Sequence, residues 1–188
     1  LAAPFLARST YVCGSVGTSP AQLEAKVRRR LANGEQNVAE AGMALTLFAA
    51  ADEVVAGDPT SIRSVIGGLE QWLYGIDTAS YGHVGVLHAP PRVEAYAADA
   101  GLLVKNGAVW QTPMGTVWSL GGGYPDNGRI YISGTAAVWR APEINVTPAA
   151  QAFDRSNNNY RLTADRHYAV SFDCVAGHAF FAPDIDAS

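Results

Sequence analysis

The feature that most constrains the fold is a long amphipathic helix, which the sequence predicts from Ser19 to Ala41. Ser19 is a good N-cap residue, Pro20 suits the first helical position, and Gln22 completes a capping box. Apolar residues then mark one face at steps of four or seven: Leu23, Val27, Leu31, Val38 and Ala41. The other face carries the charged residues Lys26, Arg28, Arg29, Arg30, Glu35 and Glu40. A helix of about 20 residues is roughly 30 Å long.

Two shorter helices follow the long one. The apolar segment Met43–Val55 either continues the long helix or turns into the core. A second helix begins at Asp58–Pro59 and ends at Gly75, with an apolar stripe at spacings of three and four. The stripe consists of Ile62, Val65, Ile66, Leu69, Trp72 and Leu73. Pro90–Pro91 open a third helix, which Gly101 ends. Its inward side chains are Val93, Tyr96, Ala97 and Ala100.

Strand patterns fill most of the remaining chain. Residues 1–18 are small and apolar and predict an extended arm or a short strand. The longest strand is Tyr160–Cys174, in which apolar and polar residues alternate. The shorter predicted strands are His83–His88, Leu102–Val104, Val109–Thr112, Thr116–Leu120, Arg129–Ser133, Ala136–Arg140, Pro142–Pro148 and Ala179–Ala182. This order of elements predicts an α+β fold, with helices packed on a largely antiparallel sheet.

The composition narrows the function class without deciding it. Charged residues make up only 16% of the chain, against about a quarter in ordinary soluble domains. A subunit that hides surface against its neighbours needs fewer charges, and a compact monomer rich in Ala and Gly is the alternative. The formal net charge of −4 argues against a protein that coats nucleic acid over its whole surface. No apolar run reaches the roughly 18–20 residues that span a bilayer, so we expect no membrane partner.

Residues that carry catalytic or metal chemistry are scattered along the chain. Cys13 and Cys174 form no C-x-x-C pair, and we interpret them as small buried residues or, alternatively, as one bridge. The four histidines form no H-x-x-x-H pair, which argues against a helical metal site. His88 lies between a strand and a helix, a common place for a catalytic group, but no G-x-S-x-G turn presents a nucleophile. We therefore predict a buried His88 bonded to a backbone carbonyl, and no catalytic residue, cofactor or metal. A small hydrolase that uses His88 with a nearby Ser and Asp is the alternative.

Three groups of residues remain as candidate contact sites. The segment 121–128 lacks the Lys and Ser or Thr of a P-loop and precedes a strand, so it predicts a flexible hairpin loop. Its key members are Gly121, Gly122, Gly123, Asp126 and Gly128. A basic group on the long helix is either a solvated face or a contact with nucleic acid or an acidic neighbouring subunit. This basic group consists of Lys26, Arg28, Arg29 and Arg30. Further arginines alternate with acidic residues near the longest strand and suit inter-subunit ion pairs on a strand edge: Arg155, Arg161 and Arg166.

Four runs of sequence, taken in order, resemble the major capsid proteins of tailed bacteriophages and prophages of actinobacteria. These runs are Ser19–Ala41, Gly85–Gly107, Met114–Tyr124 and Ala152–Cys174. The second run, which reads GVLHAPPRVEAYAADAGLLVKNG, carries more specific resemblance than the first. No single run is diagnostic, and the resemblance depends on the order of all four.

The resemblance implies the Hong Kong 97-like capsid fold. In that fold a long spine helix and a β-sheet form a peripheral domain, and a mixed α/β axial domain packs around the symmetry axes. Residues 1–18 would be the remnant of an N-terminal arm, and 19–57 the peripheral domain with the spine helix. Residues 58–149 would be the axial domain, and 150–188 the return to the peripheral domain. The segment 121–128 would be a flexible axial loop.

The family pattern also includes an arm and a protruding hairpin, the E-loop, before the spine helix. Here only 18 residues precede Ser19, and the chain begins with Leu1 rather than Met. We therefore expect the N-terminal region to be missing or removed, or the chain to be a compact variant.

The function that the resemblance implies is structural. The chain would assemble into hexamers and pentamers of an icosahedral phage head, inside the bacterial host cytoplasm, and would reside in the virion. Its partners would be many copies of itself, packaged double-stranded DNA bound without sequence preference, and also portal, scaffold or protease, and decoration proteins. An encapsulin-like nanocompartment shell, or a minor head or vertex protein of the same fold, is the alternative.

Overall fold

The predicted long helix is present and extends further than predicted. The computed structural model describes residues 3–14, 17, 19–75, 84–148, 151–173 and 175–183. In it, helix α1 spans Pro20–Ala50 and has 31 residues. Ser19 Oγ accepts the backbone N–H of Gln22, and Gln22 Oε1 accepts the backbone N–H of Ser19. The capping box therefore starts the helix as predicted, and the apolar segment after Met43 continues it.

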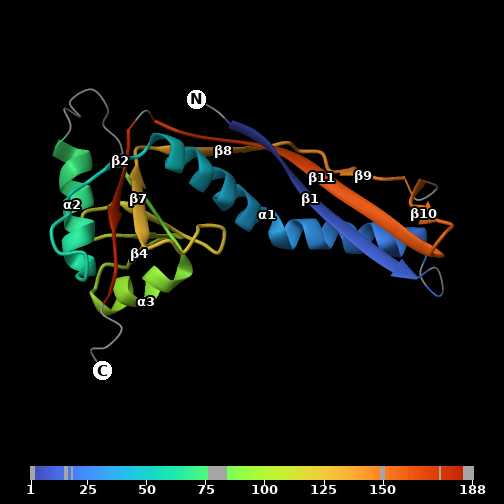
Figure 1. The fold of residues 1–188 in the computed structure, drawn as a ribbon, viewed down its shortest axis with the longest axis horizontal. Coiled ribbons are helices and arrows are strands. Elements are labelled where there is room, and N and C mark those ends of the chain that lie inside the picture. The colour runs from blue at the N-terminus through green and yellow to red at the C-terminus, as the bar shows by residue number, and fades with distance from the viewer. Residues whose placement is uncertain are drawn as a thin grey trace.

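The two halves of α1 bury different faces. The N-terminal half buries Leu23, Val27 and Leu31. The C-terminal half buries Met43, Ala44 and Leu47. At about 100° per residue these two sets lie on roughly opposite sides of the helix. One helix therefore packs on two different parts of the molecule, an elongated limb and a compact lobe (Figure 1).

The limb is a helix packed on a long antiparallel sheet. Strand β1 (Ala3–Gly14) pairs along all 12 of its residues with β11 (Asn159–Phe172). The other edge of β11 pairs with the short strands β8 (Ala136–Arg140), β9 (Asn145–Val146) and β10 (Phe153–Asp154). The predicted alternation of β11 is confirmed, because its inward residues are buried: Leu162, Ala164, Tyr168 and Val170. The predicted N-terminal arm is thus a 12-residue strand that is paired along its whole length.

The lobe is built on a seven-stranded mixed sheet. Its strand order is β2 (Asp52–Glu53), β12 (Ala176–Phe180), β7 (Arg129–Ser133), β3 (Val86–Ala89), β6 (Val117–Leu120), β5 (Val109–Gln111) and β4 (Val104–Asn106). The β3–β6 and β2–β12 pairs are parallel and the other pairs are antiparallel. The largest apolar core cluster lies here and includes residues of α2 (Ile62–Gly75) and α3 (Pro91–Asp99). The predicted α+β class is confirmed.

The helices of the lobe follow the predicted stripes. Five stripe residues of α2 are buried, namely Ile62, Val65, Ile66, Leu69 and Leu73. The helix begins three residues after the predicted Pro59, because Asp58 Oδ1 accepts the backbone N–H and the hydroxyl of Thr60 in a turn. In α3, Val93 and Ala97 are buried as predicted, whereas Tyr96 is partly exposed. His83 and Cys174 lie outside the described residues.

Strand membership cuts across the predicted domain segments. The lobe sheet includes β2 and β12, which lie outside residues 58–149. Conversely, β8 and β9 lie inside that range and pair with β11 of the limb. The four segments therefore stay a prediction, while limb and lobe are the units that the packing defines. Among the described residues, no helix combines the length and the apolar character needed to cross a membrane.

Candidate functional site

The glycine-rich segment 121–128 lies against the middle of α1. The backbone N–H of Gly123 donates to Glu40 Oε2 over 2.9 Å. A Cβ on Gly121 would overlap the Glu40 carboxylate, and a Cβ on Gly123 would overlap the carbonyl oxygen of Asn37. Gly121 and Gly123 therefore allow a close approach of the loop to the helix. This packing role was not predicted, and the flexibility predicted for the loop stays a prediction.

The second half of the loop is more open. Asp126 is exposed and pairs with Arg92 at the start of α3, with Asp126 Oδ2 and Arg92 Nη1 separated by 3.3 Å. Gly128 adopts a positive φ of 72°, which favours glycine. Gly122 is exposed, with Asn37 side-chain atoms 3.5 Å or more from where a Cβ would stand. The loop thus has an anchored first half, in which Gly122 alone is exposed, and a more open second half that exposes Asp126 and Asn127.

Tyr124 continues the anchored half into a buried hydrogen-bond chain in the lobe. His88 Nδ1 lies 2.9 Å from Tyr124 Oη, and His88 Nε2 lies 2.9 Å from Ser133 Oγ. Ser133 Oγ donates to the carbonyl oxygen of Gly134, so it accepts from His88 Nε2–H. His88 Nδ1 then accepts from the Tyr124 hydroxyl, which leaves Tyr124 Oη to accept from Ser119 Oγ, 2.8 Å away. One set of proton positions therefore satisfies every hydrogen bond in this series.

Burial keeps the imidazole of His88 neutral. Complete burial lowers the pKa of His88 to about 3, and burial is also the main cause that raises the pKa of Tyr124 to about 12. The prediction of a buried His88 is confirmed. The predicted backbone carbonyl partner is wrong, because two side-chain hydroxyls occupy both ring nitrogens.

The same geometry opposes the hydrolase alternative. Ser133 is fully buried, and the hydrogen bond of its hydroxyl to the Gly134 carbonyl oxygen competes with donation to His88. His88 is a donor to Ser133, whereas a general base must accept the proton of a nucleophile. The other ring nitrogen faces Tyr124 and not an aspartate. Within the described residues there is also no group of three or more His, Cys, Asp or Glu side chains arranged to hold a metal.

The lobe also buries an acidic side chain, Glu70, whose carboxylate accepts hydrogen bonds from hydroxyl groups. Glu70 of α2 is 5% exposed, and its Oε1 accepts from Thr112 Oγ1 over 2.5 Å and from Thr116 Oγ1 over 2.6 Å. The two threonines flank the connection between β5 and β6, so this acid holds that connection to the helix. Sequence patterns offered no signal for it, because Glu70 lies more than 40 positions before both threonines.

The limb holds an ion cluster between α1 and its sheet. Arg166 Nη1 lies 2.9 Å from Glu35 Oε1, and Arg140 Nη1 lies 3.7 Å from Glu35 Oε2. The side chains of Glu35 and Arg166 are each 11% exposed. Burial is the main cause that raises the pKa of Tyr168, which interacts with both residues of this pair. The cluster joins the middle of the helix to strands β8 and β11.

The structure corrects two predictions about the charged residues of the limb. Glu35 and Glu40 are buried and do not lie on the solvent face of the helix. The spacing contained the signal, because Glu35 continues the four-residue steps of Leu23, Val27 and Leu31. The second correction is that Arg161 and Arg166 lie on a central strand and not on a strand edge. Arg166 is engaged within its own chain, and Arg161 is exposed.

The remaining basic candidates are mostly solvent-facing. On α1, Arg28 pairs with Glu24 one turn earlier, and Lys26 lies 5.7 Å from the centre of the Tyr11 ring. Arg29 and Arg30 are exposed. Arg155 lies in an exposed turn after β10. In that turn Asp154 accepts hydrogen bonds from Ser156 and Asn157, which lower the pKa of Asp154 to about 2. Of these basic candidates, Arg28 and Arg166 form ion pairs with acidic residues of their own chain.

Large apolar side chains are exposed on both parts of the molecule. On the limb these include Val12, Val138, Trp139 and Phe153. On the lobe they include Val55, Val104, Val109, Trp110 and Met114. Exposed apolar groups that gather on one element mark surfaces for association. Two elements carry them on consecutive or paired residues, the β4–β5 hairpin of the lobe and strand β8 of the limb.

We compared the sequence and the structure with those of known proteins. No family model and no curated protein matches the sequence. Solved structures do match it over almost the whole chain. A virus-like particle protein from Pyrococcus furiosus aligns with 93% of this chain and 75% of its own, at 9% identity and a TM-score of 0.56. The mature capsid of bacteriophage PhiM1 aligns with 95% of this chain and 71% of its own, at 11% identity and a TM-score of 0.56.

The protein has the Hong Kong 97-like capsid fold. An encapsulin complex, SrpI from Synechococcus elongatus, aligns with 94% of this chain and 73% of its own, at 11% identity and a TM-score of 0.54. The fold predicted from the four ordered runs is therefore confirmed. At these identities the likeness describes the Hong Kong 97-like fold alone, and the contacts that use it must come from this chain's own residues.

Proposed function

We propose that this protein is a structural subunit of a closed icosahedral shell. In the finer form of the proposal it is the major capsid protein of a tailed bacteriophage, of the group found in actinobacteria. It assembles into hexamers and pentamers around double-stranded DNA inside the bacterial host and remains in the virion. The proposal gives the protein a mechanical role and assigns it no catalytic residue.

The observation that carries the proposal is the shared architecture of limb, helix and lobe. Solved structures named as a virus-like particle, a mature phage capsid and an encapsulin each align with at least 93% of this chain. The names of these structures describe assemblies of many copies. The exposed apolar residues on both limb and lobe support the same kind of association for this chain.

The geometry suits a load-bearing subunit. The limb sheet is held by a continuous backbone ladder between β1 and β11, and α1 runs from the limb to an apolar cluster that contains residues of both limb and lobe. Force applied to one part therefore reaches the other through helix packing and not through a flexible linker. In this proposal the limb is the peripheral domain and the lobe is the axial domain.

The candidate partners follow from the surface charges. Lys26, Arg29 and Arg30 are exposed on the N-terminal half of α1, and in the phage proposal they face packaged DNA. Portal, scaffold or protease, and decoration proteins complete the proposed set of partners.

A nanocompartment shell is the second candidate, and the encapsulin neighbour is the observation that favours it. A minor head or vertex protein of the same fold would share the subunit architecture but would not form a shell alone. Nucleic acid content separates the first two candidates, because a phage head packages DNA and an encapsulin-like shell encloses protein cargo.

The test is assembly of the purified chain, followed by electron microscopy and light scattering. The proposal expects closed particles of uniform diameter that contain many copies. Monomers at all concentrations and salt conditions would overturn the shell function. Particles recovered from the producing cell and treated with nuclease then discriminate between the candidates, since protected double-stranded DNA supports the phage head.

A further inference from the structure

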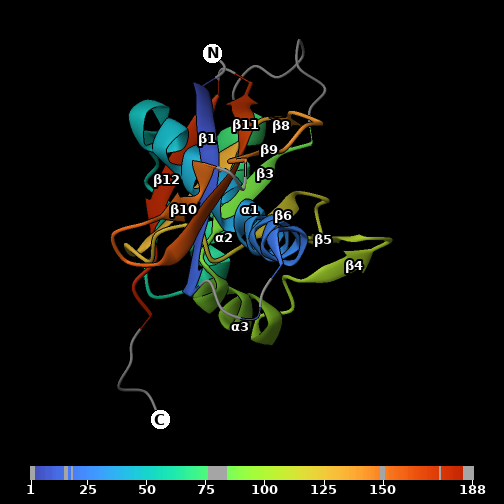
Figure 2. The same ribbon diagram turned by 90° about the vertical axis from the view of Figure 1, so that its right-hand side faces the viewer.

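The β4–β5 hairpin exposes apolar side chains on both of its faces. Val104 and Val109 lie on one face, where the hairpin also pairs Asn106 with Gln111 through their side chains. Trp110 lies on the other face beside Lys105, whose Nζ is 5.8 Å from the centre of the indole ring. All three apolar residues are more than 40% exposed. The hairpin extends away from the rest of the lobe (Figure 2), so its own chain covers neither face.

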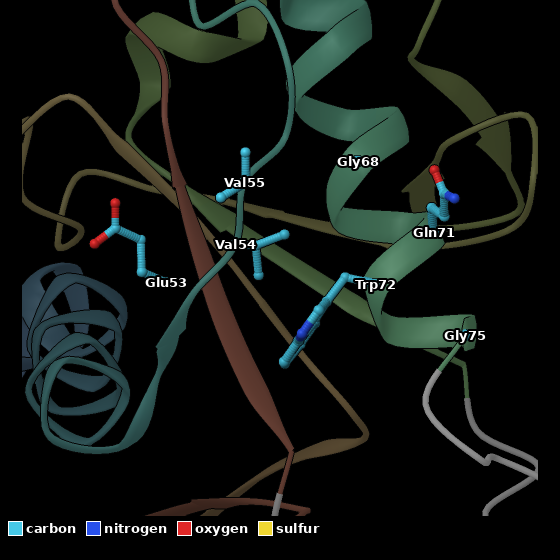
Figure 3. Close-up of a pocket in the computed structure, with 7 residues that line it drawn as sticks. All are labelled: Glu53, Val54, Val55, Gly68, Gln71, Trp72 and Gly75. Atoms are coloured by element: carbon cyan, nitrogen blue, oxygen red, sulfur yellow. The ribbon is translucent and has the colours of Figure 1, made fainter.

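The opposite edge of the same sheet carries an open groove. It has a volume of about 500 Å³ and lies between the segment that follows β2 and helix α2. Figure 3 shows Trp72 and Val54 directed toward each other across its floor, with Val55 above them. Val55 is 94% exposed, the highest value among the large apolar side chains of the described residues. The groove therefore presents apolar surface without a cover.

The hairpin cannot reach the groove of its own chain. The strands β4 and β2 are the two end strands of the seven-stranded sheet. Neighbouring strands lie about 4.8 Å apart, so the two edges are separated by roughly 29 Å. Any contact between hairpin and groove must therefore join two copies of the chain.

The two edges also carry opposite charge. Lys105 is the only charged residue in the hairpin segment 104–111, whereas Asp52 and Glu53 are the only charged residues in the segment 51–57 beside the groove. All three of these side chains are exposed. Opposite charges at matching places select one orientation of two partners and disfavour the reverse orientation.

We propose that the β4–β5 hairpin of one copy docks into the β2–α2 groove of the next copy, with Trp110 covering Val55 and Lys105 facing Asp52 and Glu53. Each copy gives one hairpin and receives one, which is a head-to-tail contact that forms a ring when its rotation closes. This inference rests on the proposed shell function and names the surfaces that hold neighbouring lobes together within a ring.

Cross-linking between two kinds of copies tests the contact directly. Chains with Val55→Cys are mixed with chains with Lys105→Cys, which lies on the same hairpin face as Trp110, and the mixture is assembled and oxidised. The products are separated on a denaturing gel. We expect disulfide-linked dimers at least about tenfold above the background of the unmodified chain, which has its own cysteines. Chains with Val55→Cys mixed with chains with Trp139→Cys are the matched control, because Trp139 is also exposed, at 54%, but lies on the limb. Adding Trp110→Ala to the Lys105→Cys chain should lower the yield about tenfold, as expected for an aromatic anchor.

Charge reversal gives an independent second readout. Lys105→Glu alone, or Asp52→Lys with Glu53→Lys, should lower the assembled fraction about tenfold, because like charges then face each other. Combining the reversals should restore assembly to within about twofold of the unmodified chain. Circular dichroism confirms that each variant is folded.

The outcomes separate this inference from the shell proposal. If the unmodified chain does not assemble, the shell function is wrong. If it assembles, but the Val55–Lys105 pair cross-links no better than the control pair and the charge reversals assemble normally, the hairpin–groove contact is wrong while the shell function stands.

Discussion

The limb and the lobe satisfy their buried titratable groups in different ways. In the limb, Glu35 meets the opposite charge of Arg166. In the lobe, His88 and Glu70 are bonded to neutral hydroxyl groups. The limb is one helix on one sheet, so its buried charges lie near solvent and can remain ionised in a pair. The lobe has the larger apolar core, where a charged imidazole is too costly and the neutral form is kept.

This difference predicts that the limb and the lobe lose stability for different reasons. Removal of one partner in the limb leaves a charge without its counter-charge, which a second substitution can repair. The lobe should lose stability at low pH, because His88, which burial keeps neutral, must then bind a proton. The contact between the two parts is of a third kind, because backbone atoms of the loop 121–128 touch α1 directly and the N–H of Gly123 donates to the buried Glu40 carboxylate.

The largest effect is expected at this contact between limb and lobe. Gly123→Ala places a Cβ over the Asn37 carbonyl oxygen and 2.6 Å from Glu40 Cβ, so loop and helix must separate. We expect a loss of about 5 kcal/mol or more in the free energy of unfolding, measured by urea denaturation. Gly122→Ala is the control, because its Cβ meets only Asn37 side-chain atoms at 3.5 Å or more. Equal stability of the two variants would contradict a rigid contact.

The next effect tests the ion cluster of the limb. Arg166→Met leaves Glu35 buried with only Arg140, at 3.7 Å, as a counter-charge. We expect a loss of about 3 kcal/mol, since a buried charge without its partner is strongly destabilising.

Replacement of both partners supplies the control for that prediction. The double variant Glu35→Leu with Arg166→Met should recover most of the lost stability, because a buried pair is often neutral against apolar residues of similar size. If the double variant is less stable than Arg166→Met alone, the limb does not depend on balancing this charge.

The sequence predicted the elements well and the contacts between them poorly. Strands β7 and β8 match the predicted ranges residue for residue, and the capping box placed the start of α1 correctly. These features follow from local spacing and backbone preferences. Glu40 was assigned to solvent, although it lies three and four residues before Met43 and Ala44 on the second buried face of α1. One helix with two buried faces has no single apolar stripe, so the pattern of its first half misassigns its second half.

The candidate site was harder to predict because its partners are distant in sequence. Glu40 and the N–H of Gly123 are 83 positions apart, and Glu35 and Arg166 are 131 positions apart. Local patterns carry no information about such pairs. The glycines at 121–123 suggested a flexible loop. Helix α1, which leaves no room for a Cβ at Gly121 and Gly123, lies in another part of the chain, so the local sequence could not show this packing role.

The smallest of the three effects is a pH dependence that separates lobe from limb. The native pKa of His88 is lowered to about 3 by burial, whereas an unfolded histidine has its ordinary value of 6.5. Below pH 6.5 the unfolded chain therefore binds a proton that the native chain does not bind, so stability falls as pH decreases toward 3. One such proton changes the free energy of unfolding by about 1.4 kcal/mol per pH unit.

We expect His88→Gln to lower stability at pH 7 but to remove this part of the slope between pH 6 and pH 4, measured by urea denaturation at each pH. His167→Gln, at an exposed position of the limb, is the control for the loss of a histidine as such. An unchanged slope in His88→Gln would mean that the lobe does not hold this imidazole neutral, and the contrast between the two parts would then reduce to their packing alone.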